Sequence, residues 1–296
     1  ATEHRAVLAA CRAAAAHTGA TLHSIPVRPD GELEHEALER LLARLPGPAL
    51  VALHSANNET GVEYRVFEIA DRAHAAGGHL VVDAIQSLGK RPVDLGVWGA
   101  DLATFSGHKI GAPPGVGAVF VRDDALFTPL LEGGGQERGR RAGTENVPGI
   151  VGFGVAAGHL PERLAAIEAT ARLRDRLEDT LTRALDGVTV HGRSRPRLPN
   201  TSFVSFAGVR GDALRIALDL AGVCVSGGSA CASGAIEPSH VLRAMGVDEP
   251  RARSAVRFSL GPDTTPAEIE RAAEHTIRLV RRQRRRGPCT DAPTPP

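Results

Sequence analysis

The sequence lacks several features that would assign it to a specialised class of protein. Its four cysteines form no C-x-x-C pair, which argues against a zinc ribbon, another metal site of that type or a thioredoxin-like redox site. The same low cysteine content excludes a disulfide scaffold and fits a reducing compartment. There is no recognisable signal peptide, and no apolar run approaches the roughly 18 residues that a membrane-spanning helix needs. We therefore expect a cytoplasmic protein that does not associate with a membrane.

The sequence also has no large excess of positive or negative charge and few aromatic residues. The formal net charge is +1 and aromatic residues make up only 3% of the chain. The arginine run at residues 281–286 contains no aromatics, so a solvated helix end explains it better than a nucleic-acid-binding patch. What is present, 42% hydrophobic and 23% charged residues in a chain of 296, is ordinary for a globular protein of one or two domains.

Short apolar strands alternate with helices in the first half of the chain. Helical spacing predicts helices over residues 5–17, 34–45 and 66–76. Apolar runs predict strands over residues 21–27, 49–53, 79–83, 102–105 and 116–121. This alternation is typical of an α/β fold with a mostly parallel sheet.

The second half has a different pattern. It predicts a long charged helix over 161–185, a half-buried strand over 200–206, a helix over 211–220, a strand over 256–260 and a final helix over 266–286. We expect a large domain over residues 1–160, a smaller α+β domain over 161–286 and a disordered tail over 287–296.

Polar residues recur just after the predicted strands: Asn58, Asp83, Gln86, Ser106 and Lys109. Ligands of open α/β sheets bind at this edge. A lysine there can point into a cleft, and its desolvated amine can attack a carbonyl to form a Schiff base. Lysines after a strand are in general solvated surface residues, but the small and hydroxyl residues beside Lys109 indicate the lysine that holds pyridoxal phosphate. Asp83 would then pair with the pyridinium nitrogen of that cofactor.

Three further segments carry candidate chemistry. Cys231 lies in a loop of glycines and serines, which favours an exposed, reactive thiolate, whereas Cys11 and Cys224 fit buried structural cysteines. Arg257, in a predicted strand, offers a bidentate fork for a substrate carboxylate. The glycine- and arginine-rich loop 133–144 suits a phosphate or a carboxylate, or is merely flexible.

Seven motifs occur in the order seen in the cysteine desulfurases, class V aminotransferase-like enzymes of the nitrogen-fixation and iron–sulfur-cluster type. The resemblance runs from about Thr2 to Arg282. The segments that carry it are Thr2–Val7, Asn57–Gly61, Val82–Ser87, Ser106–Lys109, Gly133–Thr144, the Cys231 loop with Glu237–His240, and Arg257–Gly261.

The resemblance implies a homodimer with the type I fold of pyridoxal phosphate enzymes. It implies that Lys109 binds the cofactor covalently, that Asp83 contacts its ring nitrogen and Gln86 its phenolic oxygen, and that Asn58 lies nearby. His4 would stack on the ring and move a proton. Ser106, His108 and Thr144 of the other subunit would bind the phosphate, and Arg257 would hold the substrate carboxylate.

The implied reaction converts L-cysteine to L-alanine and leaves the sulfur on Cys231 as a persulfide. An iron–sulfur scaffold or another acceptor protein would then take that sulfur. The family has a further segment before Thr2, with an Ala-Thr pair that contacts the phosphate, and nothing in this sequence matches it. An inactive homologue that serves as a binding partner therefore remains an alternative, as does a related lyase or transaminase acting on another amino acid.

Overall fold

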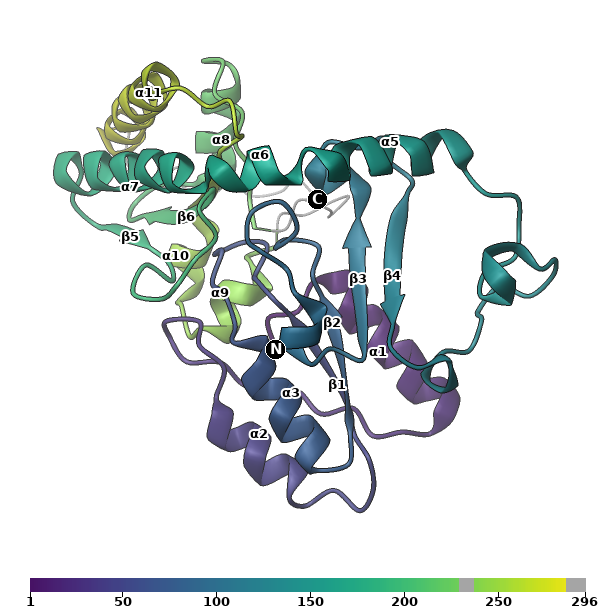
Figure 1. The fold of residues 1–296 in the computed structure, drawn as a ribbon. Coiled ribbons are helices and arrows are strands. Elements are labelled where there is room, and N and C mark those ends of the chain that lie inside the picture. The colour runs from purple at the N-terminus through teal and green to yellow at the C-terminus, as the bar shows by residue number, and fades with distance from the viewer. Residues whose placement is uncertain (229–236, 286–296) are drawn as a thin grey trace, which may run out of the picture.

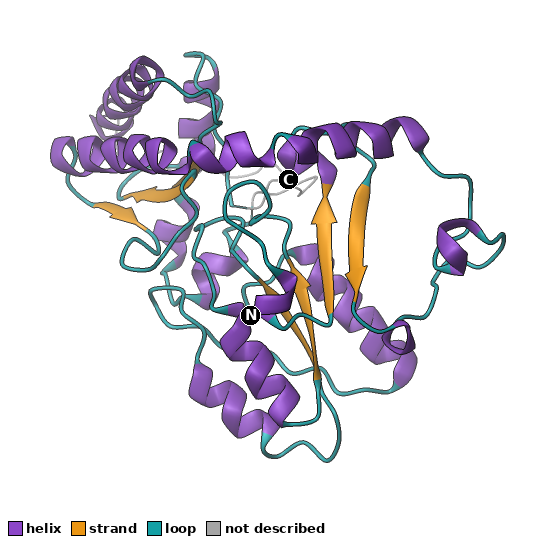
Figure 2. Ribbon diagram, viewed as in Figure 1, coloured by secondary structure: helices purple, strands orange, loops and turns teal. Residues whose placement is uncertain are grey.

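Two separate β-sheets organise the chain (Figures 1 and 2). The computed structural model describes residues 1–228 and 237–285. The first sheet has four strands in sequence order: β1 (Leu50–His54), β2 (His79–Asp83), β3 (Leu102–Ser106) and β4 (Gly117–Val121). The second has three: β5 (Val188–Val190), β6 (Thr201–Phe206) and β7 (Ala255–Ser259). The predicted α/β class is confirmed.

The first sheet is parallel except at one edge. β1, β2 and β3 run in the same direction, and only β4 pairs antiparallel with β3. In Figure 2, β3 and β4 accordingly point in opposite directions. The register sets His54 beside Asp83, and Asp83 beside Thr104. The carboxyl ends of the three parallel strands therefore meet at one edge, where the polar residues were expected.

Helices of the first half surround this sheet: α1 (Arg5–Thr18), α2 (His35–Leu42), α3 (Val66–Ala75), the short α4 (Leu95–Trp98), the 3₁₀ turn η1 (Gly107–Ile110) and α5 (Val147–Gly158). α3 packs on β1 and β2, and its Ile69 joins Leu80 and Val82 in a core of fully buried apolar side chains. α1, by contrast, contains no buried residue.

The second sheet lies between two apolar cores. Its helices are α6 (Leu160–Ala165), α7 (Ile167–Ala184), α8 (Gly211–Asp219), α9 (His240–Ala244), α10 (Glu249–Arg253) and α11 (Pro266–Arg285). Neighbouring residues of a strand face opposite ways. Phe203 of β6 accordingly joins the first core, while Val204 and Phe206 join a second core with α7, α8 and α11. None of the described helices is both long and apolar enough to cross a membrane.

Most of the predicted elements are confirmed, three are corrected, and helices α4, α5, α9 and α10 and strand β5 were not predicted. Residues 21–27 form no strand, because their one ladder contact is a bridge from Val27 to Leu33. The helix expected over 161–185 is two helices, α6 and α7, which meet at Ala166. β6 is buried on both faces, not one, because it has a core on each side. Helix α5 was not predicted, because its glycines and continuous apolar residues hide any helical period.

A buried ion pair holds α7 against the loop before β6. Glu178 on α7 and Arg197 make two parallel hydrogen bonds of 2.8 and 2.9 Å. Their side chains are 0% and 4% exposed. Two opposite charges removed from water are stable in the protein interior only while each remains paired with the other.

We therefore expect Glu178→Ala to destabilise the protein by about 3–5 kcal/mol, because it leaves the Arg197 guanidinium buried without its partner. Urea unfolding monitored by circular dichroism measures this loss. Glu168→Ala is the control, since Glu168 forms an exposed ion pair with Arg172 on the same helix, and it should change stability by no more than about 0.5 kcal/mol. Equal effects of the two variants would contradict the expectation.

Candidate active site

Hydrogen bonds join the segments that leave the three parallel strands. The amide of Ser55, just after β1, donates to the carbonyl of Asp83 at 2.9 Å, and the hydroxyls of Ser55 and Ser87 are 2.6 Å apart. The amide of Ala84, after β2, donates to Thr104 in β3 at 3.1 Å. The three strand ends therefore form one continuous polar edge.

Asp83 is the last residue of β2 and stands on this edge. One of its carboxylate oxygens, Oδ1, accepts a hydrogen bond from the amide of Ile85 at 3.0 Å. Burial raises the pKa of the Asp83 carboxyl, against the lowering effects of that hydrogen bond and of the nearby His54 and His4 charges. A cationic ligand group next to Asp83 would stabilise its ionised form. His4 itself is exposed and caps α1 through its Nδ1 atom.

Lys109 lies in the 3₁₀ turn η1, directly after β3. A side chain at Gly107 would come within 3.0 Å of Val116 and 3.1 Å of Ala112, so the turn can pack closely only with glycine there. Ser106 and His108 are linked by a contact of 2.7 Å between Oγ and Nδ1. Together with Lys109, they present a hydroxyl, an imidazole and an amine within four residues.

A pocket of about 180 Å³ extends from Lys109 to the second sheet. It lies between the strand-end turns and the loops at residues 199–200 and 260–262, with α6 and α7 completing its wall. Lys109 lines this pocket, but the residue as a whole is exposed.

Lys90 is a pocket residue that the motif analysis missed. Its ammonium donates to Oε1 of Gln86 at 2.8 Å, four positions earlier, across a hydrogen-bonded turn instead of a helix. Burial, followed by the positive charges of Lys109, Arg257 and Arg163, lowers the pKa of Lys90 to about 8. A sequence signal did exist, since Lys90 and Lys109 are the only two lysines of the chain.

Arg257 brings the second sheet to the same site. It lies in β7, and its Nη1 donates to the carbonyl oxygen of Asn58 at 2.7 Å. Its Nε is buried and has no hydrogen-bond partner among the described residues. Burial lowers the pKa of the Arg257 guanidinium, and the nearby Glu59 opposes this shift. Arg257 also exchanges two backbone hydrogen bonds, of 2.7 and 3.0 Å, with Ser226, five positions before Cys231.

Two of the predicted site residues are not confirmed at this edge. Cys231 lies outside the described residues. Thr144 is exposed, on the segment between β4 and α5 that extends away from the body of the molecule in Figure 1. The expectation that Cys11 and Cys224 are buried is wrong: Cys11 is partly exposed and Cys224 exposed, because α1 and the turn after α8 lie at the surface.

A buried glutamate that the motif analysis left without a role links the loop after β1 to the segment before α9. The hydroxyl of Ser239 donates a short hydrogen bond to Glu59 and also accepts one, at 3.1 Å, from the amide of Leu242, so that Ser239 caps α9. Gly228 packs against the same carboxylate, since a side chain there would come within 2.5 Å of it. Burial raises the pKa of Glu59, although the Ser239 hydrogen bond and the charges of His240 and Arg257 counteract the shift.

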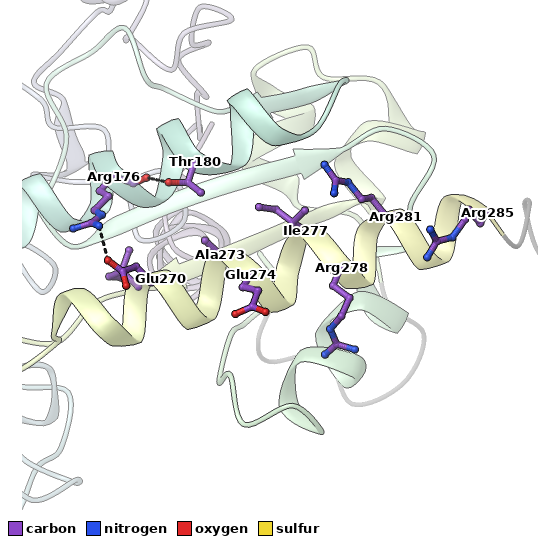
Figure 3. A pocket seen from close by; sticks show the side chains of 10 residues that line it. Arg176, Thr180, Glu270, Ala273, Glu274, Ile277, Arg278, Arg281 and Arg285 are labelled. Carbon is purple, nitrogen blue, oxygen red and sulfur yellow. Dashed lines mark hydrogen bonds and ion pairs between the residues drawn. The ribbon is translucent and has the colours of Figure 1, made fainter.

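A larger groove among the described residues, of about 640 Å³, lies elsewhere. It runs along the surface between α7 and α11, where Ile277 and Arg281 project towards α7 (Figure 3). Arg176 and Glu270 form an ion pair across it. None of the predicted site residues lines this groove, so size alone does not identify the site.

Comparisons with known proteins agree with the motifs. Residues 1–272 match the family described as aminotransferase class-V. A cysteine desulfurase of Nostoc sp. is 46% identical over 288 residues, which cover 97% of this chain and 71% of that protein. One from Cereibacter sphaeroides is 48% identical over 273 residues, 92% of this chain and 69% of that protein. Among solved structures, a NifS-like protein from Rickettsia africae is 32% identical to this chain, with a TM-score of 0.84. The match covers 95% of this chain and 74% of the Rickettsia chain.

The raised pKa of Glu59 predicts a pH-dependent stability. A carboxyl whose pKa is higher in the folded than in the unfolded state stabilises the fold below its ordinary value of 4.5, and this contribution is lost as the pH rises through the folded value. Glu59→Gln keeps an acceptor for Ser239 but cannot ionise. We expect this variant to gain stability relative to the native protein between pH 4.5 and neutrality, as measured by urea unfolding across that range.

Glu268→Gln is the control with the opposite sign. Hydrogen bonds from the amide and hydroxyl of Thr265 lower the pKa of exposed Glu268, so this variant should lose stability relative to the native protein as the pH rises. A stability difference between Glu59→Gln and the native protein that does not change with pH would contradict the raised pKa of Glu59.

Proposed function

Because the chain belongs to the class-V aminotransferase family and, within it, to the cysteine desulfurases, we propose that it converts L-cysteine to L-alanine and transfers the sulfur to Cys231 as a persulfide. The observation that carries this proposal is the single polar edge formed by the ends of β1, β2 and β3, which faces Arg257 of the second sheet. That edge carries the half-buried Asp83 carboxylate and leads to Lys109, and Arg257 contacts it through the carbonyl of Asn58.

The residues on this edge fit pyridoxal 5'-phosphate as the cofactor. The Asp83 carboxyl, destabilised by burial as an anion, suits a protonated ring nitrogen. Ser106 and His108 offer polar groups for the phosphate, Gln86 offers amide hydrogens for the phenolic oxygen, and Lys109 offers the amine that binds covalently. When bound, pyridoxal phosphate supplies an electron sink for the substrate carbon.

The chain's own groups would bind and orient the substrate. Arg257 has one terminal nitrogen bonded to the carbonyl of Asn58, and its other terminal nitrogen would hold the cysteine carboxylate. His4 lies close enough to Asp83 to interact with it electrostatically, and it would move a proton near the cofactor ring. Cys231 would act as a thiolate and attack the substrate sulfur. The S–S bond of the persulfide would form as the C–S bond of cysteine breaks, and the electron pair of that bond would stay on the carbon side, which takes up a proton to become alanine.

Other parts of the proposal concern assembly and sulfur delivery. We place Thr144 in the phosphate site of a second subunit, since the segment that carries it extends away from its own sheet. Residues 1–160 and 161–286 would act as a cofactor-binding domain and a smaller domain that carries the Cys231 loop. The persulfide would pass to an acceptor such as an iron–sulfur scaffold, and the cytoplasm suits a thiol that must return to its reduced form.

Lys109→Ala tests the cofactor assignment. Purified protein mixed with pyridoxal phosphate should develop a visible absorption band, and this variant should lack it because the attacking amine is gone. Lys90→Met is the companion variant, since Lys90 is the other lysine of the pocket, and it should keep a band. A band that survives Lys109→Ala and disappears in Lys90→Met would reverse the assignment.

Cys231→Ser tests the sulfur acceptor. We expect sulfide release from cysteine, in the presence of a reductant, to fall by at least about two orders of magnitude because the nucleophile is lost. Cys224→Ser is a matched control, because Cys224 is exposed on the same half of the chain and should be dispensable. Undiminished sulfide release by Cys231→Ser would refute its role, and faster alanine release from another amino acid than from cysteine would favour a related lyase or transaminase.

A further inference from the structure

The chain uses arginine almost everywhere that it needs a permanent cation. Only Lys90 and Lys109 are lysines among its 35 lysines and arginines, and both line the same pocket of about 180 Å³. Lysine differs from arginine in having a compact ammonium that fits a single acceptor. The proposed function employs Lys109 and leaves Lys90 without a role.

The backbone fixes the position of Lys90 against the turn that carries Lys109. Its amide donates to the carbonyl of Ser87 at 2.9 Å. The preceding residue, Gly89, has a φ of +73° and lies so close to Ile110 of η1 that a side chain there would come within 3.0 Å of it. Glycine is favoured on both counts. The backbone therefore fixes the position from which the Lys90 side chain extends.

The contact from Lys90 to Gln86 has a defined polarity. Their separation of 2.8 Å joins the Lys90 ammonium to one end of the Gln86 amide. An ammonium has three donors and no acceptor, so the amide end that faces it must be the oxygen. Both N–H donors of Gln86 are then left for other partners. An arginine at position 90 would bring five donors into a confined space and leave several of them unpaired.

We propose that Lys90 is a positioning residue that fixes the amide of Gln86, so that its N–H donors and not its oxygen face the phenolic oxygen of the bound cofactor. This inference rests on the proposed function, which assigns Gln86 to that oxygen. An ionised phenolic oxygen accepts hydrogen bonds, and a reversed amide would set two oxygens against each other. Lys90 thus acts on the cofactor through Gln86.

The test is a double-mutant cycle on cofactor binding with Lys90→Met, Gln86→Met and the double variant. The dissociation constant of pyridoxal phosphate and the wavelength of its visible band are both read by absorption titration. We expect each single variant to bind the cofactor about tenfold more weakly, as befits one lost charge-assisted hydrogen bond. The double variant should be no weaker than Gln86→Met alone, and its band should shift no further, because Lys90 has nothing left to position.

The outcomes separate this inference from the proposed function. If the effects of the two single variants multiply, or if Lys90→Met binds the cofactor normally, the positioning role is overturned while the proposed function stands. A native protein without a Lys109-dependent band overturns both. Misfolding is excluded by thermal unfolding without cofactor, where Lys90→Met should be at least as stable as the native protein because it removes a cation that burial penalises.

Discussion

The hydrogen bond from Arg257 to the carbonyl of Asn58 joins the two sheets at the place where the chemistry is expected. These residues are 199 positions apart in the chain. Asn58 ends the segment that leaves β1, and Arg257 pairs with Ser226, which leads towards Cys231. Arg257 thus contacts the loop after β1 through its guanidinium and Ser226 through its backbone.

Buried polar pairs support that junction from both sides. Glu59 binds Ser239 beyond the Cys231 segment and packs against Gly228 before it, so one carboxylate meets both ends of that segment. Glu178 and Arg197 hold the second sheet's long helix in place. Such groups cost free energy when they lose a partner, which makes each of them a specific constraint on geometry and not simply a source of stability.

The features that were predicted correctly are those that a local sequence pattern determines. The strand over residues 79–83 and the polar residues after it were foreseen, because apolar runs mark buried strands and parallel strands end at one edge. Residues 21–27 were misjudged because strand propensity is not enough without a neighbour to pair with. Glu59 and Ser239 lie 180 positions apart, so no local pattern links them. Lys90 was overlooked because its role depends on a pocket and not on a motif.

The charged groups around the site favour a ligand that has a cationic end and an anionic end. Burial raises the pKa of Asp83 on one side and lowers that of Lys90 to about 8 on the other, so each group is strained as an ion. A ligand with a cationic nitrogen near Asp83 and an anionic oxygen near the Gln86 amide, which Lys90 holds, would be stabilised at both ends. Pyridoxal phosphate has this polarity. The same electrostatics explain the Lys90 contact, because a half-buried ammonium needs an acceptor and Gln86 supplies one without adding a charge.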